Sequence, residues 1–108
     1  MIYELRVYEA VPGKLPALAA RFENHTIQFF AKHGITVVGF WTTVIGASAN
    51  ELTYMLAYEN LAEREKKWTA FSTDPDWLAI KHETEKDGPL WTNIRNQILT
   101  PTRFSPLK

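Results

Sequence analysis

Hydrophobic and polar residues alternate near the start of the chain. Between residues 2 and 9, Leu5 and Val7 fall on one side of an extended backbone, whereas Glu4 and Arg6 fall on the other. A period of two residues is typical of a β-strand whose two faces meet different surroundings. The pattern therefore predicts a first strand over residues 2–9.

From about residue 14 the apolar residues recur at steps of three and four instead. Leu18, Phe22 and Phe29 then share one side of a helix, and Gly34 is placed to end it. The spacing predicts a helix over residues 14–33.

Two segments rich in β-branched and aromatic residues follow, at residues 35–45 and 52–59. Both favour strands, and the polar turn between them, at residues 46–50, is short. A short link favours antiparallel pairing, so we expect the two segments to form a hairpin.

The second half of the chain carries two helix starts. Asn60 stands before a helical segment with an acid at Glu63, as in a capping box, and Asp74 stands before Pro75 at the next start. These signals predict one helix that begins after Asn60 and a second over residues 75–86.

Alternation returns at residues 90–99, which predicts a fourth strand, and residues 100–108 form an extended tail. The order is then βαββαβ. This order indicates an α+β, ferredoxin-like fold in one domain, residues 1–108, with a four-stranded antiparallel sheet and its helices on one face.

The central strands hold more apolar residues than one layer of helices is expected to cover. The residues in question are Val38, Phe40, Tyr54 and Leu56. Burial of this surplus predicts a homodimer that packs sheet face against sheet face.

Composition narrows the possible partners. The 108 residues carry 12 basic and 12 acidic side chains, so no excess of positive charge is available to hold nucleic acid. Cysteine is absent and the three histidines lack the spacing of ligand pairs, so no metal site is predicted. No apolar run is long enough to span a bilayer, and the first residues do not resemble a signal peptide. We therefore expect a cytoplasmic protein.

Several segments in combination resemble the NIPSNAP family. They are residues 3–8 with Pro12-Gly13-Lys14, residues 39–43 with Gly46, the stretch from Tyr58 through Leu61-Ala62-Glu63-Arg64 to Asp74-Pro75-Asp76-Trp77, and the ending at residues 98–106. The family belongs to the dimeric α/β barrel superfamily, so the resemblance implies the same fold and a homodimer. It implies no particular reaction. The chain departs from many members at Leu56, where they have a tryptophan.

His25 and Tyr58 are the candidates for acid–base chemistry. His25 falls near the apolar stripe of the first predicted helix, where it could face a pocket between helix and sheet as a general base. The alternative is a partly buried structural histidine.

Polar side chains gather on two strands that are expected to be neighbours. Glu4 and Arg6 share a face of the first strand, and Arg95 lies on the fourth. The arginines could bind a small carboxylate or carbonyl compound, or they could pair with Glu4 in an ion network.

Aromatic side chains could line an apolar cavity for a flat ligand, or fill the core. The candidates are Trp41, Tyr54, Tyr58, Trp68, Phe71 and Trp77. Trp68 with a downstream His82 is similar to a tryptophan and histidine of haem-degrading relatives in the superfamily, but those enzymes have an asparagine where the first strand here has Glu4 or Arg6. No cofactor is predicted, and haem is kept as an alternative.

Three functions stay open at this point. We prefer a NIPSNAP-like dimer that binds a small apolar or aromatic molecule in a cleft between sheet and helices. Convergence of His25, Tyr58 and Trp68 on one cavity would support this function, and a solid core in that place would end it. The second is a cofactor-independent monooxygenase or haem-handling enzyme, in which His25 or Tyr58 would remove a proton. The third is a non-enzymatic assembly module.

Overall fold

The alternating segment at the start of the chain forms a strand in the middle of a four-stranded sheet. The computed structural model describes residues 1–108. In chain order its elements are β1 (Ile2–Ala10), α1 (Leu15–Arg21), the π-helix η1 (Phe22–Thr26), α2 (Ile27–Lys32), β2 (Thr36–Thr42), β3 (Glu51–Tyr58), α3 (Leu61–Ser72), α4 (Pro75–Thr84) and β4 (Trp91–Leu99). The predicted βαββαβ order is confirmed. None of the helices has the length and apolar character that crossing a membrane requires.

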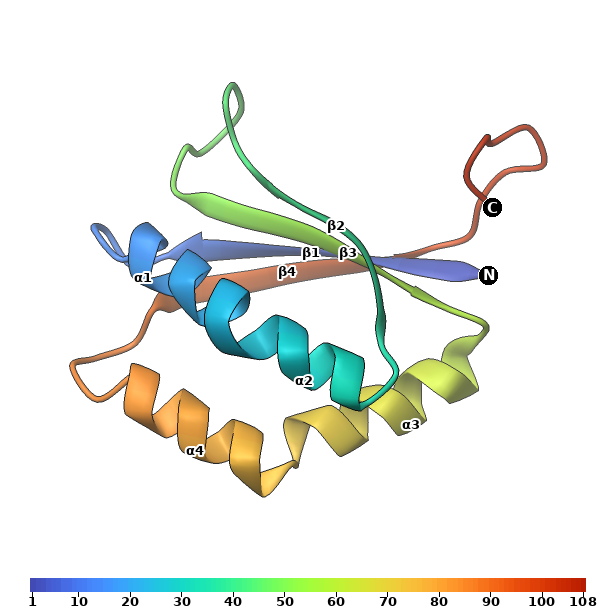
Figure 1. Ribbon diagram of the computed structural model, residues 1–108. Helices are drawn as coiled ribbons and strands as arrows, with labels where there is room; N and C mark the ends of the chain where they lie inside the picture. The colour runs from blue at the N-terminus through green and yellow to red at the C-terminus, as the bar shows by residue number, and fades with distance from the viewer.

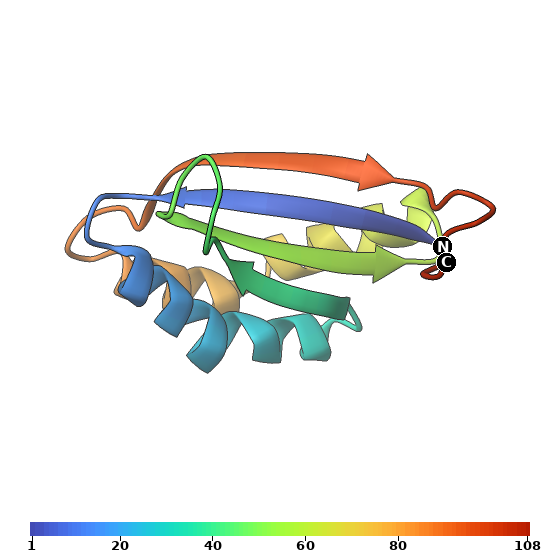
Figure 2. The same cartoon turned by 90° about the horizontal axis from the view of Figure 1, so that it is seen from above.

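The sheet has the strand order β2-β3-β1-β4, and all neighbouring strands are antiparallel. The predicted hairpin of β2 with β3 is therefore confirmed, as is the pairing of β4 with β1. The helices gather on one side of the sheet (Figure 1), and its other face is open when the molecule is seen from above (Figure 2). Along β1, Glu4 and Arg6 point toward the helices, whereas Leu5 and Val7 face the open side.

The two predicted capping residues begin their helices as expected. The Asn60 side chain accepts a hydrogen bond from the Glu63 N–H at 2.9 Å, and the Glu63 carboxylate accepts one from the Glu59 N–H at 2.9 Å. The Asp74 carboxylate accepts a hydrogen bond from the Asp76 N–H at 2.9 Å. These bonds satisfy N–H groups that the first helical turn leaves without partners.

The first helix is not the continuous α-helix that the spacing predicts. Leu18, Phe22, Thr26 and Phe30 are buried along it, at steps of four. Four residues are more than one α-helical turn of 3.6 residues, so a straight α-helix would rotate these side chains off a common face. The wider turn of η1 keeps them on one side.

Most of the apolar residues that one layer of helices was not expected to cover lie on the helix side. Tyr54 and Leu56 are fully buried, and the ring of Phe40 packs on Tyr54 with centroids 5.1 Å apart. Only Val38 is exposed, beside a register shift in β2. The helices cover three of the four residues because α1–α2 and α3–α4 lie side by side across the sheet (Figure 2), and Val38 is left uncovered.

Candidate functional site

A cavity of about 180 Å³ lies between the sheet and the helices. Aromatic side chains from β1, β3, β4 and the helices make up most of its wall: Tyr8, Phe22, Phe30, Tyr54, Trp68, Phe71, Trp77 and Trp91. Sites for drug-sized ligands enclose about 300–1,000 Å³. This cavity therefore has room for a molecule about the size of one ring.

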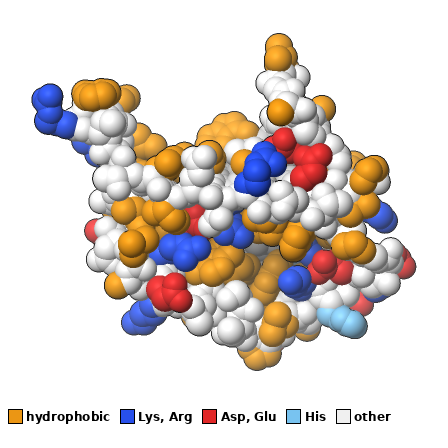
Figure 3. Space-filling model, turned by 180° about the vertical axis from the view of Figure 1, so that it is seen from behind, with side chains coloured by type: hydrophobic (Ala, Val, Ile, Leu, Met, Phe, Trp, Pro, Cys, Tyr) orange, Lys and Arg blue, Asp and Glu red, His pale blue; other side chains and the backbone are white.

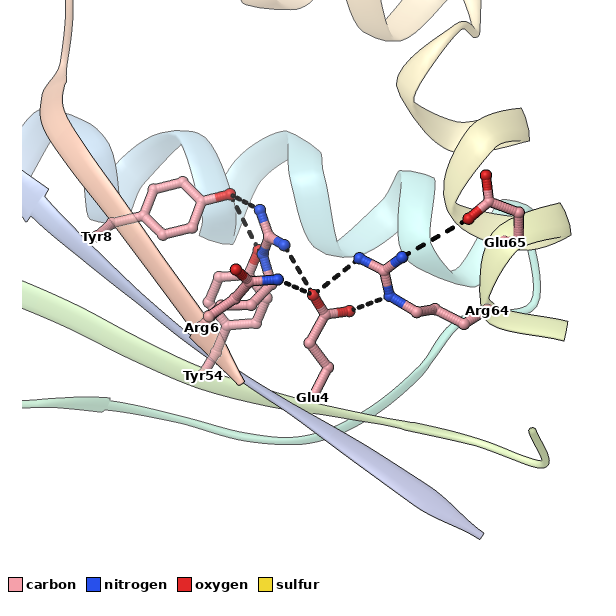
Figure 4. A network of polar contacts seen from close by, with 7 residues as sticks. Glu4, Arg6, Tyr8, Tyr54, Arg64 and Glu65 are labelled. Atoms are coloured by element: carbon pink, nitrogen blue, oxygen red, sulfur yellow. Dashed lines mark hydrogen bonds and ion pairs between the residues drawn. The ribbon is translucent and has the colours of Figure 1, made fainter. Parts of the chain in front are cut away.

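Arg6 is the central polar group of the cavity (Figure 4). Its Nε donates to Tyr54 Oη at 2.9 Å, its Nη1 to the Glu4 carboxylate at 2.9 Å, and its Nη2 to Tyr8 Oη at 3.3 Å. The guanidinium carbon lies 4.3 Å from the centre of the Trp68 ring, which is a cation–π distance. Burial by itself lowers the pKa of Arg6, but the two tyrosines and Glu4 outweigh burial and raise it. Arg6 is thus charged and held in one orientation.

Glu4 lies behind Arg6 and has 0% of its surface exposed. Its carboxylate accepts hydrogen bonds from Arg64 at 2.9 and 3.0 Å and from Asn96 at 2.9 Å, in addition to the bond from Arg6. Burial raises the pKa of Glu4, but the hydrogen bonds from Arg64, Asn96 and Arg6 lower it, and the net result is a lowered pKa. The carboxylate is therefore the shared anion of an ion network.

Two further cations line the cavity, Arg21 at the end of α1 and Lys81 in α4. The Arg21 guanidinium carbon lies 5.6 Å from the centre of the Trp77 ring. No carboxylate and no histidine lines the cavity. Figure 3 shows Lys and Arg side chains set among hydrophobic ones across the middle of one face. The cavity thus combines aromatic walls with positive charge.

Five of the predicted pocket residues line this one cavity: Arg6, Tyr54, Trp68, Phe71 and Trp77. They come from β1, β3, α3 and α4, so only the folded chain brings them together. Glu4, another of them, contacts the cavity through Arg6.

His25 does not line the cavity. Its side chain is half-buried, and the neighbouring Thr26 occupies the inner position, because η1 shifts the buried stripe by one residue. The prediction that His25, Tyr58 and Trp68 converge on one cavity is therefore wrong.

Tyr58 is buried in β3, but it also lies outside the lining of the cavity. Its Oη has no hydrogen-bond partner. Burial, and then the negative charge of Glu4, raise the pKa of Tyr58 to about 12. The Tyr58 phenol therefore stays protonated at neutral pH. Because a tyrosine can act as a general base only as the phenolate, Tyr58 is unsuited to that role.

Trp41 and Arg95 lie on the open face of the sheet, away from the cavity. The Trp41 side chain is 50% exposed, and Arg95 donates to the Glu51 carboxylate at 2.9 Å. Arg95 does not share a pocket with Arg6 because β4 pairs with β1 in a register that sets Asn96 opposite Arg6. Neighbours in an antiparallel register share a face, so Asn96 joins the network and Arg95 does not. Trp41 faces away because β2 pairs with β3 in a register that sets Phe40, not Trp41, opposite Tyr54.

The two residues suggested for haem, Trp68 and His82, do not line one cavity. Trp68 stacks on Arg6 inside the cavity, whereas His82 is exposed on α4 and does not line the cavity. The structure therefore does not bring these two side chains together around this cavity.

Tyr8 and Arg21 line the cavity but were not among the predicted site residues, whereas Trp77 was among the aromatic candidates. Arg21 stands three residues after Leu18, so it falls within the buried stripe of the first helix. A charged residue at such a position was a signal that could have been used, because arginine is seldom buried without a partner.

The architecture matches that of known proteins. SnoaB, a cofactor-independent oxygenase from Streptomyces nogalater, superposes with a TM-score of 0.60 over 99% of this chain and 97% of that chain, at 11% sequence identity. Similarity at this identity shows the fold alone. The protein thus has the ferredoxin-like α+β fold found in dimeric α/β barrel proteins.

The family is shown by sequence. The NIPSNAP family profile matches residues 3–106, so the chain belongs to the NIPSNAP family, as its sequence predicts. Protein Atu4242 from Agrobacterium tumefaciens is 31% identical, with a TM-score of 0.87 over 100% of both chains. The NIPSNAP family protein Atu5224 from the same species is 27% identical, with a TM-score of 0.87 over 99% of this chain and 98% of that one. Among curated protein sequences none matches the chain.

Proposed function

We propose that this NIPSNAP protein binds a small, largely apolar or aromatic molecule in the cavity between the sheet and the helices. The observation that carries the proposal is the aromatic cavity of about 180 Å³ around the buried guanidinium of Arg6. Apolar cavities with a few convergent polar groups are the usual form of small-molecule sites. Because Arg6 is already oriented by Glu4 and two tyrosines, the site is formed before a ligand arrives.

The lining of the cavity favours binding over catalysis by proton removal. A cofactor-independent oxygenase that ionises its substrate needs a base within reach of the substrate proton. No carboxylate or histidine lines this cavity, and burial raises the pKa of the Tyr54 phenol well above its ordinary range. We therefore expect no oxygen uptake with phenols or quinols.

A thermal-shift and calorimetric screen with single-ring compounds tests the proposal, because a ligand that binds only the folded chain raises its Tm. Ile94→Phe fills the cavity, since Ile94 lines it, and this variant should abolish the shift. Ile98→Phe is the matched control, because Ile98 lies on the same face of β4 but outside the lining. If no single-ring compound binds the wild type, the proposal fails.

We propose in addition that the chain forms a homodimer through the open sheet face. Leu5, Val7 and Met55 lie on that face and are only partly buried. Two segments with exposed apolar residues rise beside it, the β2–β3 loop with Val44 and Ile45 and the C-terminal tail with Phe104 (Figure 1). A second copy set against this face would bury all of these side chains.

The mass in solution tests the homodimer. Light scattering should give twice the chain mass for the wild type, and Val7→Glu should reduce it to one chain. Ile27→Glu places the same charge at an exposed residue of α2 and should leave the dimer intact. A wild type that is monomeric at micromolar concentration would contradict the proposal.

A further inference from the structure

Arg21 is a buried arginine whose hydrogen-bonding capacity is largely unused. Its side chain is 3% exposed, and its Nε has no hydrogen-bond partner. The contacts of Nη1 are long, at 3.4 Å to Thr84 Oγ1 and 3.4 Å to a Glu85 carboxylate oxygen. A buried cationic donor without good acceptors lowers the free energy of unfolding. The protein itself therefore supplies no good hydrogen-bond acceptor for the Arg21 guanidinium.

The contrast with Arg6 identifies Arg21 as the available cation. Both arginines line the same cavity. Arg6 donates from each of its three nitrogens to a protein oxygen within 3.3 Å. The hydrogen bond and the ion pair of the Arg21 side chain are both 3.4 Å long. A ligand that enters the cavity can pair with Arg21 without breaking an existing hydrogen bond of the same quality.

The charges around the cavity favour an anion. Glu4, the carboxylate behind Arg6, is shared with Arg64, and Glu85 approaches Arg21 at 3.4 Å, so two negative charges stand beside three positive ones. Lys81 adds a further cation to the lining, and no carboxylate lines the cavity. A cavity with an excess of buried positive charge attracts a negatively charged group.

The shape and chemistry of the cavity narrow this anion to one class. A planar guanidinium forms two parallel hydrogen bonds with a carboxylate, and the ring of Trp77 lies beside the Arg21 guanidinium at 5.6 Å. The remaining wall is largely aromatic, and the volume of about 180 Å³ holds about one ring. We infer that, at the site proposed above, the ligand is a small aromatic or apolar monocarboxylate whose carboxylate accepts hydrogen bonds from Arg21.

Benzoate and benzamide test this inference, because they have the same size and shape but differ in charge. Isothermal titration calorimetry should show that the wild type binds benzoate at least about tenfold more tightly than benzamide, as expected for a charge-assisted hydrogen bond. Arg21→Met should remove most of this preference. Lys66→Met, which removes an exposed cation of α3 outside the cavity, should retain it.

Each outcome separates the inference from the proposal of a binding site. If benzoate and benzamide bind the wild type equally, or if Arg21→Met keeps the preference, the carboxylate inference is overturned and the binding site stands. If neither compound nor any neutral single-ring compound binds, both are overturned. If Arg21→Met does not fold, Arg21→Lys replaces it, because lysine keeps the charge but lacks the planar guanidinium. Arg21→Lys should weaken the binding of benzoate and leave the binding of benzamide unchanged. An unchanged affinity for benzoate overturns the inference.

Discussion

The fully buried Glu4 carboxylate of β1 accepts two hydrogen bonds from the Arg64 guanidinium of α3, from Nε at 2.9 Å and from Nη2 at 3.0 Å. The pair joins the sheet to a helix beside the cavity (Figure 4). Because the same carboxylate also holds Arg6, the position of α3 and the orientation of the central cavity arginine depend on one side chain.

Glu4→Gln should lower the free energy of unfolding by about 3 kcal/mol, because it leaves two cations at a buried position without their shared anion. Urea denaturation measures this change. Glu65→Gln is the control, since Glu65 is 77% exposed and lies 3.8 Å from the same Arg64 guanidinium. An exposed pair of this kind contributes little, so the control should unfold as the wild type does. Equal losses in the two variants would contradict the role assigned to Glu4.

The acid side of the stability curve should depend on Glu4. Its pKa in the folded chain lies below the ordinary value of 4.5, so near that pH the unfolded chain binds more protons than the folded one. The contribution of ionised Glu4 to the free energy of unfolding is therefore fully present above the pKa of Glu4 in the unfolded chain. It is lost as the pH falls through the pKa of Glu4 in the folded chain. Urea titrations from about pH 7 down to about pH 3 should show the difference between wild type and Glu4→Gln shrinking toward acid pH. A difference that stays constant would rule out this linkage.

Asn60→Ala should lower the free energy of unfolding by about 1 kcal/mol, because the first turn of α3 loses the acceptor for the Glu63 N–H. Thermal unfolding followed by circular dichroism measures the effect. Asn60→Asp keeps an acceptor at the same position and should restore most of the Tm. If the aspartate variant is as unstable as the alanine variant, the cap is not the cause.

Asp74 should be much more important for stability than its neighbour Asp76. Its buried carboxylate accepts hydrogen bonds from Lys32 at 2.7 Å and from His33 Nε2 at 2.8 Å, and it caps α4. Asp74→Ala therefore removes the link between the end of α2 and the start of α4. Asp76 is exposed and only approaches Lys32 at 3.6 Å, so Asp76→Ala should leave the Tm nearly unchanged. Similar melting curves for the two variants would show that this link does not stabilise the fold.

Local signals accounted for the success of the sequence analysis. The capping residues Asn60 and Asp74, the stop at Gly34 with its φ of +68° and the alternation of β1 act within a few residues, so they could be found without a structure. The residues that resemble the NIPSNAP family were equally accessible, and the family profile confirms them. The homodimer, the cytoplasmic location and the bound ligand stay predictions.

The errors concern how elements meet. Arg95 was grouped with Arg6, although the β1–β4 register sets Asn96 opposite Arg6 and turns Arg95 to the other face. A shift of one residue in register reverses the face of every side chain in a strand, and no local pattern determines that shift.

The sequence by itself determined the order of strands and helices, the family and part of the aromatic wall, because these follow from period, caps and residue type along the chain. Tertiary structure alone decided which polar groups share the cavity. The π-helix η1 placed Thr26 rather than His25 on the inner side and left Arg21 buried beside Trp77. The physical reason is that a wider helical turn and a strand register depend on packing against distant segments, whose contacts are set only when the chain has folded.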